Sequence, residues 1–144
     1  MKVKTLLEGK PFMTEYGIVG YSTVVLIACD DEKNILYDCG SKGCALQLKE
    51  ALEKAGMKPE DITHVVISHL HFDHVGNLPL FSDAEILLNK IEWESANQTP
   101  DEWHSIQTLA YLEKRGNLRF VKEGDIIAEG VSIMELPGHT PGLI

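Results

Sequence analysis

The segment Thr63–Asn77 reads Thr-His-Val-Val-Ile-Ser-His-Leu-His-Phe-Asp-His-Val-Gly-Asn and joins a strand signal to a group of potential metal ligands. Its first part, Thr63–Ser68, is short, rich in β-branched residues and preceded by turn residues at Pro59–Asp61, which predicts a buried strand. Four side chains with metal-binding atoms follow directly, namely His69, His71, Asp73 and His74. The segment therefore predicts a metal site where a buried strand ends.

The spacing of the first two histidines favours one shared ion. His69 and His71 are two residues apart, so both imidazoles project to the same side if the backbone stays extended beyond the strand. A third imidazole would complete the three-ligand arrangement of a catalytic zinc, which leaves the fourth position to water. His139 is the candidate, because proline and glycine lie on both sides of it in the loop Leu136–Gly142.

Asp73 and His74 lie beyond a turn, so we expect them to serve a second, adjacent metal. Histidine and carboxylate ligands without thiolate fit one or two Zn²⁺ ions, with Fe²⁺, Mn²⁺ or Co²⁺ as alternatives. Such an ion supports hydrolysis, because its bound water loses a proton near pH 7 and becomes a nucleophile. A purely structural zinc site is the weaker interpretation, because such sites usually complete their ligand set with cysteine.

The rest of the chain alternates strand and helix patterns, which indicates an α/β fold. Four apolar residues lie near one face of an amphipathic helix that ends at Gly56, namely Leu46, Leu48, Leu52 and Ala55. The expected strands are a hairpin of 17–29 with 35–37, then 84–88, 118–122 and 131–136, and the expected helices are 44–55 and 89–115 with a break at Pro100.

Length and composition limit the class of protein. The 144 residues suit one domain, and the longest apolar run, Val24–Cys29, is far too short to cross a bilayer. The 22 acidic against 13 basic residues give a net charge of −9, which argues against nucleic acid as a partner. Residues 1–8 contain no apolar segment of signal-peptide length, and the three cysteines have no C-x-x-C spacing. We therefore expect a cytoplasmic protein with reduced thiols and no disulfide framework.

Three motifs together resemble the metallo-β-lactamase fold superfamily of metal-dependent hydrolases. Leu36–Gly40 (Leu-Tyr-Asp-Cys-Gly) is similar to the first motif of that family, His69–His74 to the second and Gly138–His139 to the third. Within the family, His-Leu-His-Phe-Asp-His-Val-Gly-Asn and Pro-Gly-His-Thr-Pro-Gly look most like the branch of N-acyl homoserine lactonases and related lactone or thioester hydrolases.

The resemblance implies a role for each residue that matches a motif. It implies that His69, His71 and His139 hold the first metal, that Asp73 and His74 belong to the second, and that Asp73 is catalytic. Asp38 would orient the ligand loop, although an acidic residue that caps a turn after a strand is the alternative.

The resemblance also implies a fold. It implies that residues 1–144 form a single domain, the N-terminal half of an αββα sandwich, with one mixed sheet and helices on its outer face. The family also supplies a bridging aspartate and a final histidine from its C-terminal half, so we expect this chain to be truncated before that half. A half-sandwich would expose its apolar sheet face, which predicts self-association as a homodimer through that face.

The leading functional prediction is a hydrolase that uses a metal-bound hydroxide on a small ester, lactone or thioester substrate. Phosphodiesterase or ribonuclease chemistry on the same fold is one alternative, and a metal-binding half-domain without activity of its own is another. We expect a small-molecule substrate and neither nucleic acid nor membrane as a partner.

The remaining histidines and aromatic residues receive less specific predictions. His64 is predicted to be a packed or edge histidine, and His104 to lie on the surface of a helical stretch. Alternatively, residues 93–111, with Trp93, Trp103 and Tyr111, form part of a substrate wall. Four residues of the N-terminal segment could shape its entrance, namely Phe12, Met13, Tyr16 and Tyr21.

Overall fold

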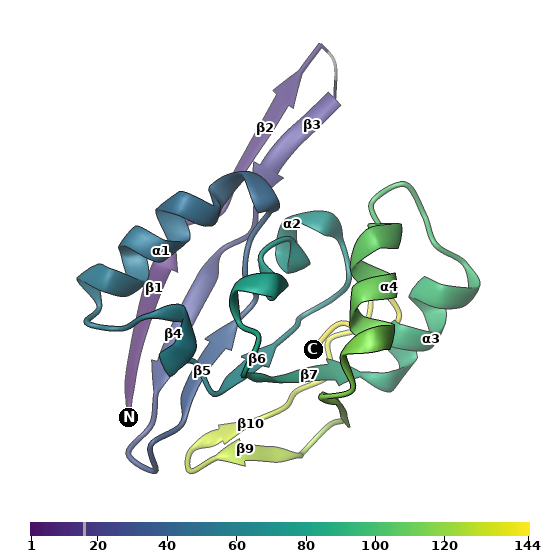
Figure 1. Ribbon diagram of the computed structural model, residues 1–144. Helices are drawn as coiled ribbons and strands as arrows, with labels where there is room; N and C mark the ends of the chain where they lie inside the picture. The colour runs from purple at the N-terminus through teal and green to yellow at the C-terminus, as the bar shows by residue number, and fades with distance from the viewer. Residues whose placement is uncertain (16) are drawn as a thin grey trace.

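A mixed sheet with helices on one face forms the body of the molecule (Figure 1). The computed structural model describes residues 1–15 and 17–144, so the predicted role of Tyr16 lies outside the described residues. Within these ranges, six strands form the sheet in the order β1-β4-β5-β6-β7-β8. Their bounds are β1 Lys2–Leu7, β4 Val24–Ala28, β5 Asn34–Tyr37, β6 His64–Val66, β7 Glu85–Asn89 and β8 Leu118–Val121.

The strand directions explain how the sheet is assembled. β4 runs antiparallel to both of its neighbours, β1 and β5, whereas β5, β6, β7 and β8 run parallel to one another. The predicted hairpin is confirmed for β4 and β5, in which Val25 pairs with Tyr37. Its first part is different, because Gly17–Tyr21 is a separate strand, β3, that pairs with β2 (Lys10–Thr14) in a two-stranded sheet projecting from the body (Figure 1).

Helices cover one face of the sheet. They are α1 Ala45–Lys54, α2 Phe72–Val75, α3 Lys90–Gln98 and α4 Ile106–Arg115, with short 3-10 turns η1 Lys42–Cys44, η2 Pro59–Asp61 and η3 Leu78–Leu80. Leu52 of α1 and Leu112 of α4 pack in one buried cluster with Val65 and Ile86 of the sheet. The helix predicted over 44–55 and the pair predicted around Pro100 are therefore confirmed, as is the mixed sheet with helices on one face. Leu46, which was expected on the apolar face of the first helix, is instead 67% exposed.

The opposite face of the sheet is covered by the end of the chain. Ile35, Val66 and Leu87 are at most 5% exposed, because β9 (Ile126–Ala128), β10 (Val131–Ser132) and residues 133–144 pack over them. The expected exposed sheet face is therefore covered at its centre, although self-association stays a prediction. The strand predicted over 131–136 is too long, since it ends at residue 132 and an irregular segment follows.

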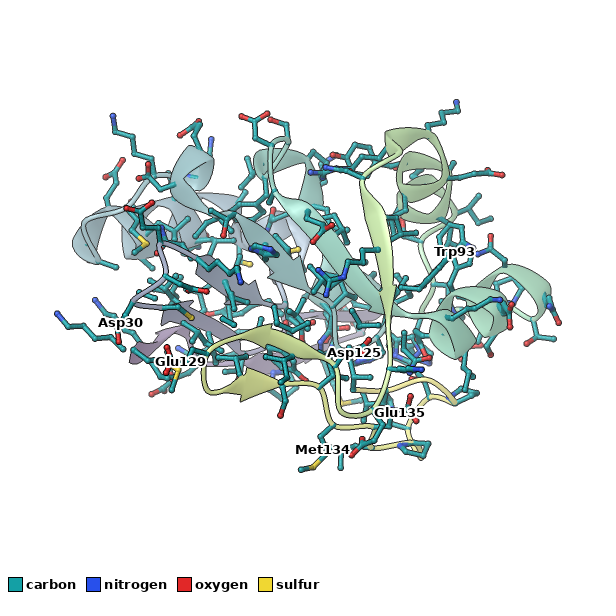
Figure 2. All side chains as sticks on the ribbon, turned by 90° about the horizontal axis from the view of Figure 1, so that it is seen from below. Asp30, Trp93, Asp125, Glu129, Met134 and Glu135 are labelled. Carbon is teal, nitrogen blue, oxygen red and sulfur yellow. The ribbon has the colours of Figure 1, made fainter. Side chains whose placement is uncertain are left out.

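Figure 2 shows the molecule from below, with the helices at the top, β9 and β10 toward the bottom, and Met134 at the lower edge. Met134 is 62% exposed and Ile126 is 74% exposed, so apolar surface remains on the covering segment itself. None of the helices within residues 1–15 and 17–144 combines the length and the apolar character needed to cross a bilayer. Cys29, Cys39 and Cys44 are free thiols.

Candidate metal centre

Three imidazoles converge beyond the carboxyl end of β6. His69 and His71 lie on the segment that leaves β6, and His139 lies in the C-terminal loop, which is tied back where Ile144 N donates to Ser68 O at 3.2 Å. The three ring centroids are 4.6, 4.8 and 4.9 Å apart, with interplanar angles of 77°, 86° and 87°. Their candidate ligand atoms all lie within 4.8 Å of one another. The structure thus brings together the three histidines predicted for the first metal.

The donor atoms of this group suit a divalent ion. His69 Nε2 is buried and has no hydrogen-bond partner among the described residues, whereas Nδ1 lies 3.0 Å from Ser68 Oγ. His139 Nε2 and His71 Nδ1 are 3.1 Å apart, close to the separation of about 3.4 Å for two nitrogens that bind one tetrahedral zinc. Burial, followed by the neighbouring histidines, lowers the pKa of His69 to about 2. The imidazole is therefore neutral at pH 7, which is the form that binds metal.

Asp73 and His74 form a separate pair beside this group. His74 Nε2 lies 3.6 Å from Asp73 Oδ2, and the His74 ring lies 3.9 Å from that of His69. Burial alone would lower the pKa of His74, but the hydrogen bond and charge of Asp38, together with Asp73, outweigh it and raise the pKa. In the part of the chain that the structure describes, no group of three or more candidate ligands includes either residue. The second-metal role of Asp73 and His74 stays a prediction.

Asp38 holds the ligand segment through hydrogen bonds to Ser68 and a close contact with His74. Its carboxylate accepts hydrogen bonds from Ser68 N at 2.8 Å and Ser68 Oγ at 2.7 Å, and its Oδ2 lies 2.7 Å from His74 Nδ1. The side chain is 2% exposed, and the backbone adopts a left-handed φ of 59°. These contacts are the ones that the predicted orienting role requires, and they account for a carboxylate in the first motif.

Gly76 lets the ligand segment pack closely on that first motif. Gly76 N donates to Gly40 O at 2.8 Å, and Cys39 N donates to His74 O at 2.8 Å. A Cβ at Gly76 would overlap the backbone at Ser41 and Lys42, so only glycine fits. The two motifs are therefore fixed to each other through their backbones.

Glu92 is a buried polar residue that sequence reasoning missed. It is 1% exposed and accepts hydrogen bonds from Leu70 N at 2.9 Å and from Gly142 N at 3.2 Å. One carboxylate thus joins the segment of His69 and His71 to the loop of His139. A signal was present, because an acidic side chain four residues before the buried Ala96 lies on the buried face of α3.

The predicted surface position of His104 is wrong. Its side chain is 7% exposed, because the loop between α3 and α4 folds back against the ligand segment. His104 Nδ1 lies 2.7 Å from Asp101 Oδ1, and Asp101 Oδ2 lies 3.5 Å from His71 Nε2. His71, Asp101 and His104 form a second group of candidate ligand atoms.

The metal centre opens onto a cavity of about 370 Å³. Its lining includes His71, Asp73 and His139 from the candidate site and the aromatic side chains of Tyr21, Phe72 and Trp103. The substrate-wall alternative is thus supported geometrically for Trp103, which stacks on Phe72 at 6.2 Å. Tyr111 lies instead along a different cavity.

His64 lies away from this centre. It is half-buried at the start of β6, with Nδ1 2.7 Å from Thr63 Oγ1 and Nε2 3.7 Å from Glu85 Oε2. Its contacts are those of the packed or edge histidine that was predicted.

The chain resembles curated and solved proteins of one family. It is 37% identical over 92 residues to an N-acyl homoserine lactonase of Bacillus cereus, a match that covers 63% of this chain and 34% of that protein. The chain therefore spans about a third of that curated relative's length.

Two solved structures share the fold. A predicted metallo-β-lactamase of Thermotoga maritima superposes with a TM-score of 0.85 at 22% identity, covering 99% of this chain and 69% of that one. AidC, described as a dizinc quorum-quenching lactonase, superposes with a TM-score of 0.67 at 24% identity, covering 88% of this chain and 52% of that one.

The sequence of this chain also matches a protein family. The family model of the metallo-β-lactamase superfamily matches residues 17–144, which include all three motifs. The chain therefore belongs to the metallo-β-lactamase superfamily.

Proposed function

We propose that the protein is a zinc-dependent hydrolase of small ester, lactone or thioester substrates. The observation that carries this proposal is the convergence of His69, His71 and His139 at the wall of a cavity of about 370 Å³. The identity of 37% to an N-acyl homoserine lactonase supports a lactone as the substrate class, and the description of AidC as a dizinc enzyme supports zinc as the metal.

In the proposed reaction the three histidines and Asp73 have different roles. When bound, the metal lowers the pKa of a water to about 7 and so supplies a nucleophile at neutral pH. The three imidazoles would hold the ion as neutral ligands and would not offset its positive charge. Asp73 is the candidate catalytic residue, because its carboxylate lines the cavity, where it could accept the proton that the attacking water loses and return that proton to the leaving oxygen of the substrate.

The cavity and the charge of the chain favour a small uncharged substrate. Tyr21, Phe72 and Trp103 offer an apolar wall that suits an acyl chain. The net charge of −9 repels polyanions, so it disfavours a ribonuclease. We include a cytoplasmic location in the proposal, which the free thiols of Cys29, Cys39 and Cys44 support.

The test compares three substrates with zinc-loaded protein: N-hexanoyl homoserine lactone, an acyl thioester and bis(p-nitrophenyl) phosphate. We expect hydrolysis of the lactone or thioester, its loss in His139→Ala, and its retention in His64→Ala. The second variant is the matched control, since His64 is a histidine outside the centre. Asp73→Asn should lower kcat more than it raises KM, because it removes the proton-carrying group.

Other outcomes would overturn the proposal. Turnover of the phosphodiester alone would assign phosphodiesterase chemistry to the site. Metal binding without turnover of any of the three substrates would favour a metal-binding module.

A further inference from the structure

We propose that Asp101 and His104 are positioning residues that hold the His71 imidazole with its Nδ1 turned toward the metal centre. The inference rests on the proposed function in one respect, namely that His71 is a metal ligand. It concerns a loop between α3 and α4 that carries none of the three family motifs.

The two nitrogens of His71 face different neighbours. Nδ1 lies 3.1 Å from His139 Nε2, on the side where the three imidazoles converge. Nε2 points the other way, is buried, and has no hydrogen-bond partner within the described ranges 1–15 and 17–144. A neutral imidazole that binds metal through Nδ1 carries its proton on Nε2, and a buried N–H requires an acceptor.

Asp101 supplies that acceptor. Its Oδ2 lies 3.5 Å from His71 Nε2, slightly beyond hydrogen-bond length, so a small rotation of either side chain closes the bond. A carboxylate that accepts from the free N–H of a metal-binding histidine fixes both the tautomer and the orientation of the ring.

His104 and the backbone hold the Asp101 carboxylate in place. Asp101 Oδ1 accepts from Trp103 N at 2.9 Å and lies 2.7 Å from His104 Nδ1. The His104 side chain is only 7% exposed and its ring lies 5.0 Å from that of His71 at an angle of 82°. Asp101 itself is 47% exposed, so this packing is needed to keep its carboxylate directed at His71.

The loop is anchored to the ligand segment at neighbouring positions. Phe72 N donates to Trp103 O at 2.8 Å, and the two aromatic rings stack with an interplanar angle of 14°. His71 and His104 also pair as an isolated antiparallel bridge. The loop and the ligand segment are therefore held in register, which gives the long contact from Asp101 to His71 a defined geometry.

A second ion held by His71, Asp101 and His104 is the competing interpretation of the same atoms. It is disfavoured because His71 would have to give up both ring protons to bind an ion on each side. Asp101 Oδ1 and His104 Nδ1 also already lie 2.7 Å from each other, so an ion there would have to displace this contact to use either atom.

The test uses Co²⁺ bound to the whole chain, with visible absorption and chelator competition as readouts. Asp101→Ala should weaken Co²⁺ binding by about 10- to 100-fold and change the d–d absorption band, because the ring is no longer fixed. Asp101→Asn should recover part of this loss, since its amide oxygen still accepts a hydrogen bond. Glu102→Ala is the matched control, with the same change of charge at the next position, and should bind Co²⁺ within about twofold of the parent protein.

Two outcomes would overturn the inference. The first is that Asp101→Ala retains the parent affinity and spectrum. The second is that Asp101→Ala loses one of two bound Co²⁺ ions while the other keeps its affinity and spectrum. The second result would make Asp101 a ligand of a separate ion. Substrate turnover is not among the readouts, so a protein that binds Co²⁺ but hydrolyses nothing would count only against the proposed function. Circular dichroism of each variant checks that it remains folded.

Discussion

Glu92→Gln tests whether one carboxylate joins the two loops that carry the histidines. Glu92 Oε1 accepts from Leu70 N at 2.9 Å and Oε2 accepts from Gly142 N at 3.2 Å. Glutamine has nearly the same shape but only one oxygen, so its NH₂ group must face one of the two backbone donors. Because the side chain is 1% exposed, water cannot replace the lost acceptor.

The expected loss of stability follows from the one hydrogen-bond acceptor that Glu92→Gln removes. Leaving one buried donor without an acceptor costs about 1–3 kcal/mol, so we expect Glu92→Gln to lower the free energy of unfolding by about 2 kcal/mol. Glu92→Ala would leave both backbone N–H donors without an acceptor and would open a cavity. Its cost of about 2–6 kcal/mol overlaps the whole stability of a typical domain, about 5–15 kcal/mol, so glutamine is the more informative change.

Urea denaturation of the metal-free protein, followed by tryptophan fluorescence, measures the effect. Glu94→Gln is the matched control, because Glu94 lies on the same helix, its side chain is 50% exposed, and its carboxylate forms a surface ion pair with Lys90 at 3.5 Å. It should change stability by less than about 0.5 kcal/mol. If Glu92→Gln is no more destabilising than Glu94→Gln, the two loops are not held together by this carboxylate.

Three further predictions use the same protein. Gly142→Ala should lower thermal stability by about 1–3 kcal/mol in calorimetry, because a Cβ there would overlap the backbone of Glu92; an unchanged melting temperature would contradict the packing. The metal-free protein should lose stability as pH falls below about 6.5, because His69 has a pKa of about 2 in the folded state and an ordinary pKa in the unfolded state. This residue contributes up to about 1.4 kcal/mol per pH unit to the loss. In urea titrations at several pH values, His69→Gln should therefore show a weaker dependence of stability on pH. We also propose that the chain self-associates through the exposed apolar surface at Met134. Light scattering should then find dimers at micromolar concentration, and Met134→Glu should shift these dimers to monomers. A monomeric parent protein would refute this proposal.

Elements whose burial repeats along the chain could be predicted from the sequence. In α1, Leu48 and Leu52 are buried at helical spacing, and Val65 and Val66 of β6 are buried on opposite faces. β1 gave no such signal, because Lys2–Leu7 is an edge strand with mostly exposed side chains. The position of β1 depends instead on its pairing with β4, which lies about twenty residues away in the sequence. Local patterns therefore predict the centre of the sheet better than its edge.

The same distinction applies to the candidate site. His69 and His71 could be paired from their spacing, and His139 from the proline and glycine around it. Asp101 and His104 could not, because each reaches the centre only through the fold of the segment between β7 and α4. For Glu92 the helical spacing from Ala96 indicates burial, but not the two backbone groups that its carboxylate contacts. Asp101 and His104 also lie in an irregular loop, which has no periodicity to show that the His104 side chain is buried.

The contacts of the imidazoles show why these supporting residues matter. His69 Nδ1 lies 3.0 Å from Ser68 Oγ, while its Nε2 has no partner among the described residues. His74 repeats the arrangement, with Nδ1 at Asp38 and Nε2 toward Asp73. In both rings a protein group holds Nδ1, so Nε2 is the nitrogen that would bind an ion. In His71 the roles of the nitrogens are exchanged, so its holding group must lie on the Nε2 side, where Asp101 is found.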